Sequence, residues 1–328
     1  MRAGRLAALV AAGLGLLACA PGTPAPPAEP HDLPRRVWLP EEPPRAVILA
    51  VHGFNDYSNA FTDFGAFAAE QGVAVHAYDQ RGFGANPDPG RWPGTAALIE
   101  DLLRERERLG TLYPDTPVYL LGESMGAAVI IAAAARDAPL DDDGIILSAP
   151  AVWGGDQLSR FYRATLWVMV RVAPGLELTG NGLKIMASDN IEMLRGLSAD
   201  PLFIKGTRVD AIAGLVELMD IAALSVDRLG GPLLVLGGAR DQVVPPGAHQ
   251  AMLRRLTAQP CVEIVYPDGY HMLLRDLQRE AVWNDILAWI DHKTIASGSA
   301  VRCPDAGATP AEIETAAEGP AAPGRESL

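Results

Sequence analysis

The segment YLLGESMGAAV, residues 119–129, constrains the fold most, because a strand-like apolar run passes within a few residues into an alanine-rich, helix-like run. Ser124 stands at the junction, between Gly122 and Gly126. Two glycines at these positions permit a turn so sharp that the serine hydroxyl stays exposed at its tip. The pattern therefore predicts a strand, a tight turn and a helix, with Ser124 either as a nucleophile or as a small residue at the turn.

Short apolar runs on both sides of this segment predict further strands. The predicted strands are residues 35–39, 46–51, 73–78, 118–121, 144–148, 232–237 and 262–266, and the predicted helices are residues 59–71, 95–113, 125–137, 246–259 and 280–292. Most of these strands are nearly continuous in Val, Ile and Leu, as is typical of parallel strands buried on both faces. The alternation predicts an α/β fold with a mostly parallel, doubly wound sheet and a ligand site at the carboxyl ends of its strands.

Residues from about 152 to 229 interrupt this alternation, because they contain several helix-like stretches and no convincing strand. Such an insertion predicts a helical cap over the site. Trp153, Phe161 and Tyr162 are the candidate substrate-binding residues of the cap. Apolar residues recur here at spacings of three and four, which indicates either packing of the cap on the core or contact with lipid.

A serine hydroxyl becomes a strong nucleophile only when a base removes its proton and an acid orients that base. His271 is the candidate base, because it follows the last predicted strand in a glycine-containing loop. Asp241 is the candidate acid, since it directly follows a buried strand and precedes the base in chain order. Asp268 is the alternative acid, although its closeness to His271 in sequence also suits a residue that caps the turn.

A second loop completes the predicted site. His52 and Gly53 end a predicted strand, and in hydrolases of this shape the loop that follows donates a backbone N–H to the developing oxyanion. Phe54 and Met125 are therefore the predicted oxyanion-hole residues, Met125 because it directly follows the nucleophile. His52 is predicted to shape the loop through hydrogen bonds.

Six short sequence segments, taken in order, resemble the monoacylglycerol lipase and lysophospholipase family of α/β-hydrolases. This family is similar to the serine aminopeptidases S33. The segments are HG at 52–53, YDQRGFG at 78–84, GESMG at 122–126, SAP at 148–150, ARDQVV at 239–244 and YHML at 270–273. The resemblance covers about residues 46–291. Glu123 and Phe83 depart from the family pattern, which often has histidine at both positions. The cap is less similar than the core, so the resemblance leaves the choice of substrate open.

The resemblance and the predicted site together imply an α/β-hydrolase fold and a serine ester hydrolase. We expect it to cleave the acyl ester of a single-chain lipid, such as a monoacylglycerol or a lysophospholipid, without a metal or organic cofactor. The alternatives are a carboxylesterase or peptidase for small soluble substrates, and a lipoprotein that uses the fold for binding alone.

The N-terminus predicts export and lipid attachment. Two arginines precede a short apolar run that ends in LLAC, the arrangement of a signal peptide over residues 1–18. LLAC resembles the bacterial lipobox, which implies acylation of Cys19 and a tether over residues 19–34; the alternative is an ordinary secretory peptide with a chance cysteine. Ala20 stands where the resemblance implies an aspartate for retention in the inner membrane. The expected location is therefore the outer membrane, facing the periplasm.

The rest of the sequence limits partners and boundaries. We expect a hydrolase domain over residues 35–293 and a disordered tail over residues 294–328, which lack a sustained apolar pattern. The formal net charge of −13 argues against binding to nucleic acid and against electrostatic adhesion to anionic lipid. Cys261 and Cys303 would lie in an oxidising compartment, but their spacing alone does not establish a disulfide. The sequence gives no indication of oligomeric state.

Overall fold

The computed structural model describes residues 32–136, 140, 142–153, 159–180, 185–256, 261–292 and 300–303. The predicted signal peptide, Cys19 and nearly all of the predicted tether lie outside these residues, as does most of the predicted tail.

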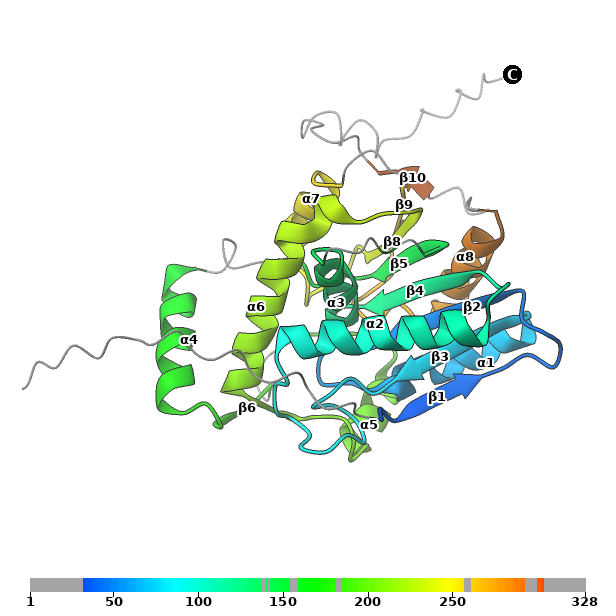
Figure 1. Ribbon diagram of the computed structural model, residues 1–328. Helices are drawn as coiled ribbons and strands as arrows, with labels where there is room; N and C mark the ends of the chain where they lie inside the picture. Colours follow the sequence, from blue (N-terminus) through cyan, green and yellow to red (C-terminus); the bar gives the residue numbers. More distant parts are fainter. Residues whose placement is uncertain are drawn as a thin grey trace, which may run out of the picture. The chain divides into compact units, whose positions relative to one another are not determined.

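The central sheet is mostly parallel (Figure 1). Its strands are β1 (Arg35–Trp38), β2 (Ala46–Val51), β3 (Val73–Tyr78), β4 (Val118–Glu123), β5 (Gly144–Ser148), β8 (Leu233–Gly238), β9 (Cys261–Tyr266) and β10 (Ala300–Arg302). They stand in the order β1, β3, β2, β4, β5, β8, β9, β10. The inner strands β3, β2, β4, β5, β8 and β9 pair in parallel with their neighbours. The edge strands are antiparallel, β1 to β3 and β10 to β9. The predicted sheet is confirmed, and every predicted strand is present within two residues at either end.

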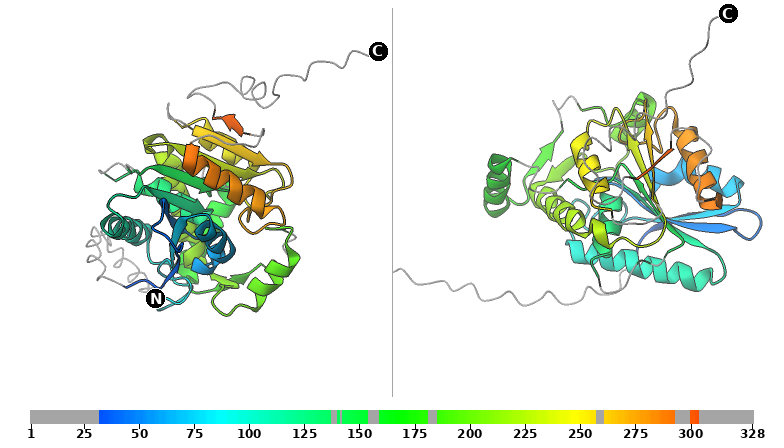
Figure 2. Two further views of the ribbon diagram at one scale, coloured as in Figure 1. Left: turned by 90° about the vertical axis from the view of Figure 1, so that its right-hand side faces the viewer. Right: turned by 90° about the horizontal axis from the view of Figure 1, so that it is seen from above.

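Helices cover both faces of the sheet (Figures 1 and 2). The helices of the core are η1 (Ser58–Phe61), α1 (Thr62–Glu70), α2 (Thr95–Leu112), α3 (Met125–Ala133), α7 (Pro246–Leu253) and α8 (Arg279–His292). Side chains of α1 and α8 pack in one apolar cluster, and those of α2, α3 and α7 pack in another cluster on the opposite face. The predicted doubly wound arrangement is therefore confirmed. α3 and α7 end earlier than predicted, at Ala133 and Leu253.

Burial explains why these residues form the core. Every residue of β2, β3 and β5 is buried, as their uninterrupted apolar sequences predict for strands covered on both faces. Every residue of α3 is buried as well, because its alanines and glycine let it lie close to the sheet between neighbouring helices. The strand and helix that flank Ser124 are thus among the most enclosed elements, which fixes the position of the turn between them.

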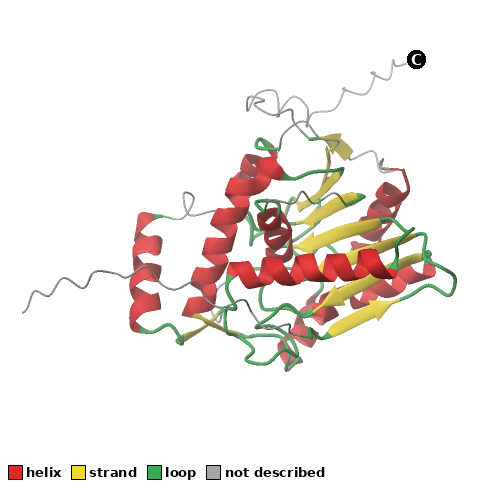
Figure 3. Cartoon of the chain, in the orientation of Figure 1, coloured by secondary structure: helices red, strands yellow, loops and turns green. Residues whose placement is uncertain are grey.

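The insertion after β5 contains helices and a small second sheet (Figure 3). Its elements are α4 (Arg160–Val172), β6 (Glu177–Thr179), α5 (Ile191–Ala199), β7 (Gly206–Arg208), α6 (Val209–Ser225) and η2 (Val226–Arg228). β6 and β7 pair antiparallel, so the prediction that this interval contains no strand is wrong. Both strands have only three residues and none of these is buried, so they leave no apolar pattern in the sequence.

α6 is the element of the insertion that joins the core. Its residues Leu218, Met219 and Ala222 are buried in the same cluster as α3. α4 packs against α6 and lies farther from the sheet (Figure 1). Among the residues that the structure describes, no helix combines the length and the apolar content that crossing a bilayer requires.

Residues 300–303, the described part of the predicted tail, join the central sheet. β10 adds to the free edge of β9, and Cys303, directly after β10, forms a disulfide with Cys261 at the start of β9. The disulfide that the spacing left open is therefore present. The expectation of disorder is wrong for residues 300–303, because strand pairing and a covalent link hold a segment whose composition offers little to bury.

Candidate active site

Ser124 lies at the tight turn that the sequence predicts between β4 and α3. Its backbone has φ +53° and ψ −111°, a conformation that side-chain-bearing residues rarely adopt. A Cβ atom on Gly126 would collide with the carbonyl oxygen of Val51, and one on Gly122 would lie 2.5 Å from the backbone of Ala127. The two flanking glycines are therefore required by close backbone contacts, and the turn has the geometry expected of a nucleophile elbow.

Ser124, His271 and Asp241 form a continuous hydrogen-bonded chain. The Oγ of Ser124 lies 2.9 Å from Nε2 of His271, and Nδ1 of His271 lies 2.8 Å from Oδ2 of Asp241. An ionised carboxylate can only accept, so Nδ1 donates to Asp241 and Nε2 is left to accept from the serine hydroxyl. This is the arrangement in which imidazole can take the proton of a nucleophilic serine.

The surroundings of Asp241 favour the ionised form of its carboxyl group. Its Oδ1 accepts hydrogen bonds from the backbone N–H groups of Val243, at 2.7 Å, and Val244, at 2.9 Å. Burial alone would raise the pKa of Asp241, but the hydrogen bond and charge of His271 and the two amides outweigh it and hold this pKa below its ordinary value. The carboxylate therefore stays charged at neutral pH.

Asp268, the alternative acid, takes no part in this chain. Its side chain is exposed and pairs with Arg240 on the neighbouring loop. The backbone N–H of Arg240 also donates to the carbonyl of Gly269, so Asp268 belongs to a surface contact between two loops.

The loop after β2 meets the elbow at the predicted position. A Cβ built on Gly53 would lie 3.5 Å from Cβ of Ser124, and Phe54 and Ser124 line the same pocket. Met125 begins α3, so its N–H has no partner within the helix and is free to point toward a ligand. Phe54 thus lies at the pocket that Ser124 lines, and Met125 directly follows Ser124; their role as an oxyanion hole stays a prediction.

His52 shapes this loop, as predicted. Its Nε2 accepts from the backbone N–H of Gln80 at 2.9 Å, its Nδ1 lies 2.8 Å from the carbonyl of Gly53, and its own carbonyl accepts from the Gln80 side chain at 2.8 Å. Because Nε2 accepts, Nδ1 is the donor. Burial lowers the pKa of His52, which keeps the ring neutral in this role.

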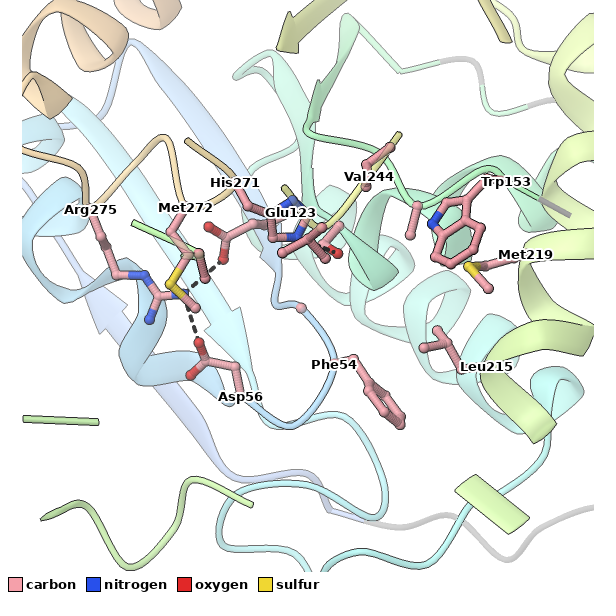
Figure 4. Close-up of a pocket in the computed structure, with 15 residues that line it drawn as sticks. Phe54, Asp56, Glu123, Trp153, Leu215, Met219, Val244, His271, Met272 and Arg275 are labelled. Atoms are coloured by element: carbon pink, nitrogen blue, oxygen red, sulfur yellow. Dashed lines mark hydrogen bonds and ion pairs between the residues drawn. The ribbon is translucent and has the colours of Figure 1, made fainter. Parts of the chain in front are cut away.

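A pocket of about 240 Å³ opens at Ser124 (Figure 4). It is apolar at one end and charged at the other. The apolar end is formed by Trp153, Leu215, Met219 and Val244, and the charged end by Asp56, Glu123 and Arg275, with Met272 beside them. His271 lies between the two ends in Figure 4. A bound ester could therefore place two chemically different groups on the two sides of its carbonyl.

The structure brings only one of the three predicted substrate-binding residues to this pocket. Trp153 lines it, but Phe161 and Tyr162 do not. Their side chains are 75% and 67% exposed on α4, which is separated from the pocket by α6. The insertion reaches the pocket instead through Leu215 and Met219 of α6. Their spacing of four residues places both on one helix face, which is the signal in the sequence that could have identified them.

The charged end of the pocket was not predicted. Nη2 of Arg275 donates to Oδ2 of Asp56 at 2.7 Å and to Oε2 of Glu123 at 3.2 Å, and all three side chains are buried. Burial would lower the pKa of Arg275, but the two carboxylates raise it above its ordinary value. Burial raises the pKa of Glu123, and the charge of Arg275 only partly offsets this effect. Glu123 was noticed in the sequence as a departure from the family pattern, but its ion pair was not.

The insertion also holds the loop that carries His271. The backbone N–H groups of His271 and Met272 both donate to the carbonyl of Ala187, which itself lines the pocket. Ser188 donates to Oδ1 of Asp276 at 2.5 Å, and Oδ2 of Asp276 accepts from the N–H of Tyr270 at 2.7 Å. Burial raises the pKa of Asp276 to about 6. The segment before α5 and the base therefore share one set of hydrogen bonds.

Known proteins are similar to most of this chain. The model of the family described as serine aminopeptidase, S33, matches residues 42–278. The monoacylglycerol lipase of Mycolicibacterium smegmatis is 28% identical over 262 residues, which cover 77% of this chain and 91% of that protein. Human monoglyceride lipase is 24% identical over 81% of this chain and 88% of its own length.

The fold has close counterparts among solved structures as well. The crystal structure of Paleococcus ferrophilus monoacylglycerol lipase is 23% identical and aligns with a TM-score of 0.69 over 80% of this chain and 100% of that chain. The family match covers most of the chain, and the relatives are similar along nearly their whole length. The chain therefore belongs to the serine aminopeptidase S33 family of α/β-hydrolases and is a carboxylic ester hydrolase.

Proposed function

We propose that the protein hydrolyses the acyl ester of a single-chain lipid, a monoacylglycerol or a lysophospholipid, through an acyl-enzyme on Ser124. The observation that carries the proposal is the chain of hydrogen bonds from Ser124 through His271 to Asp241, which opens on a pocket with an apolar end. The names of the relatives from M. smegmatis and human, both lipases for monoacylglycerols, support the same class of substrate.

In the first half of the proposed reaction Oγ of Ser124 attacks the ester carbonyl carbon, while Nε2 of His271 takes the hydroxyl proton. The carbonyl oxygen becomes an oxyanion and accepts from the N–H groups of Phe54 and Met125, each donor contributing about 3 kcal/mol. The bond to the alcohol oxygen then breaks, and His271 returns its proton to that oxygen. An alcohol leaves, and the acyl group stays on Ser124.

In the second half a water molecule attacks the acyl-serine and gives one proton to His271. The tetrahedral intermediate collapses, Ser124 regains its proton from His271, and the fatty acid leaves. One water is consumed for each ester cleaved, and no electrons are gained or lost. Asp241 keeps the imidazole in the required tautomer and stabilises its charged form in both halves.

The apolar end of the pocket suits the acyl chain. Trp153, Leu215 and Met219 offer apolar surface beside the nucleophile, and each methylene group buried there contributes about 0.8 kcal/mol. A substrate with a longer chain is therefore expected to react faster until the pocket is filled.

The N-terminal sequence supports a proposal about location. We propose that Cys19 is acylated after removal of residues 1–18, and that the chain is anchored in the outer membrane, facing the periplasm, by a tether over residues 19–34. Such an anchor would keep the pocket near its lipid substrates. Replacement of Cys19 by alanine should move the protein from the membrane fraction to the soluble periplasmic fraction, and continued membrane attachment would contradict the proposal.

Two experiments separate this function from its alternatives. A fluorophosphonate probe should label the wild type and not Ser124→Ala; a folded wild type without label would favour a non-catalytic binding protein. A series of nitrophenyl esters should show a higher kcat/KM for medium or long chains than for acetate. A sharp preference for acetate would instead indicate a carboxylesterase for small soluble substrates, and cleavage of aminoacyl amides in its place would indicate a peptidase.

A further inference from the structure

We infer that the charged end of the pocket is an alcohol subsite that accepts uncharged, hydroxyl-bearing leaving groups and rejects phosphate-bearing ones, with Glu123 as the residue that determines this specificity. The inference rests on the proposed ester hydrolysis and narrows its substrate class from two kinds of lipid to one, the acylglycerols.

The position of the charged end supports this assignment. An ester bound at Ser124 has its acyl chain on one side of the carbonyl and its alcohol on the other. Trp153 and Met219 mark the apolar end, where the acyl chain is expected, while Asp56 and Arg275 lie beyond His271 on the other side (Figure 4). The leaving alcohol therefore meets the charged end.

The balance of charge there is unfavourable for a second anion. Two carboxyl groups, of Asp56 and Glu123, share the single guanidinium of Arg275, which donates to both. The charge of Arg275 is thus already compensated, and a phosphate placed beside it would face two carboxyl groups in a buried environment. Like charges brought together in this way disfavour binding strongly.

The hydrogen-bonding capacity of the same groups favours hydroxyls. Within the described part of the chain, Oε1 of Glu123 and Nε of Arg275 are buried atoms without a hydrogen-bond partner, although both residues line the pocket. Glu123 is 2% exposed and Arg275 is 7% exposed. One of these atoms is an acceptor and the other a donor, and buried groups of this kind gain stability when a partner arrives. A hydroxyl both donates and accepts, so a polyol can satisfy both, whereas an ionised phosphate oxygen can only accept.

Glu123 is the residue on which the selection depends. It directly precedes Ser124, at the end of β4, so the path of the strand into the elbow fixes its position beside the nucleophile. Without the Glu123 carboxylate, Arg275 would pair with Asp56 alone. The positive charge of the guanidinium would then be less compensated and could bind a phosphate.

The first test uses the wild type. Monooleoylglycerol and oleoyl-lysophosphatidate, which share an acyl chain and differ by a phosphate, are presented at the same low mole fraction in neutral detergent micelles. We expect kcat/KM to be about 100-fold higher for the uncharged substrate. A ratio near one would overturn the inference.

The second test uses Glu123→Gln, which keeps the shape of the side chain and removes its charge. We expect the ratio of the two kcat/KM values to fall about tenfold, mainly because the phosphate-bearing substrate reacts faster. Glu70→Gln, the same change at an exposed position on α1, is the matched control and should leave the ratio unchanged. An unchanged ratio in folded, probe-reactive Glu123→Gln would overturn the role of Glu123. If that variant does not fold, the wild-type ratio decides alone.

A third substrate separates failure of this inference from failure of the proposed function. Nitrophenyl decanoate carries neither glycerol nor phosphate. If the wild type hydrolyses this ester, and if fluorophosphonate labelling of the protein depends on Ser124, the protein is an ester hydrolase. The two tests above then bear only on the alcohol subsite. If it is not hydrolysed and no label forms, the proposed function itself fails, and the inference fails with it.

Discussion

At the scale of single residues, the candidate site depends on groups that hold one another in a reactive state. Asp241 accepts from His271 and from two backbone amides, and His271 accepts from Ser124. The sequence predicted all three of these residues because each follows the carboxyl end of a strand, where parallel sheets bind their ligands. It did not predict Arg275 or Asp276, because single charged residues in a loop carry no periodic pattern.

Asp241→Asn tests the role of the acid. The amide can donate to Nδ1 of His271, which would put the proton on Nε2 and leave the serine hydroxyl without an acceptor. We expect kcat for ester hydrolysis to fall by about 10⁴, with little change in KM and in the melting temperature. A loss of less than tenfold in steady-state assays would show that Asp241 is not the orienting acid.

Asp276 provides a test by pH. Its folded-state pKa, raised to about 6 from an ordinary value of 3.8, means that the native state binds the proton more tightly than the unfolded chain does. The contribution of Asp276 to the free energy of unfolding must therefore decrease as pH rises from about 4 to about 6, and stay constant above that range. The lowered pKa of Asp241 acts only at lower pH, where its stabilising charge is lost.

Asp276→Asn removes this dependence. The free energy of unfolding of wild type and variant is measured with urea at several pH values. Between pH 4 and pH 6 the value for the wild type should fall, relative to that of the variant, by up to about 3 kcal/mol. Groups that titrate identically in both proteins cancel in this difference. A difference that does not vary with pH would show that Asp276 is not buried as a charged group at neutral pH.

At the scale of elements, the long and the short segments differ in how far they could be predicted. β2, β3 and β5 are continuous apolar runs that the sheet buries completely, so composition alone identified them. β6 and β7 pair without burying a single side chain, so nothing in their composition separates them from loops. Helices of the insertion were predicted, but which of them faces the pocket depends on tertiary packing that a sequence pattern does not contain.

The elbow is the element whose geometry is most restrictive. Gly126→Ala would drive a methyl group into the carbonyl of Val51, so we expect loss of activity and a decrease of about 3 kcal/mol or more in the free energy of unfolding. Gly196→Ala on α5 is the matched control, because its Cβ would meet nothing within 4 Å and alanine is the better helix former. The control should gain about 0.5 to 1 kcal/mol. Equal effects in urea denaturation would show that the backbone contact of Gly126 with Val51 does not restrict the turn.

At the scale of the whole molecule, the sequence predicted one α/β-hydrolase domain with an insertion, and the described residues confirm its sheet and helices. The predicted disorder after residue 293 was wrong where β10 and Cys303 join β9, because a short strand and a disulfide do not need an apolar core of their own. Acylation of Cys19 and the outer-membrane location stay predictions, since those residues lie outside the described part of the chain.

The disulfide closes a segment with a sequence separation of 42 residues. A link over such a length restricts the unfolded chain, so reduction should lower the free energy of unfolding by about 2 to 4 kcal/mol. Cys303→Ser should reproduce this loss, and reductant should then have no additional effect. Denaturation curves that coincide with and without reductant would show that the link does not contribute to stability.

We propose above all that Ser124 carries the acyl group of a single-chain lipid ester. The most direct test of this proposal is to mix the enzyme with monooleoylglycerol, quench with acid within the first turnovers, and measure the intact protein mass together with the released oleate. We expect an oleoyl adduct on Ser124 in the wild type, and in Ser124→Ala neither the adduct nor more than about 10⁻⁴ of the wild-type rate. Release of oleate by Ser124→Ala at the wild-type rate would contradict the proposal.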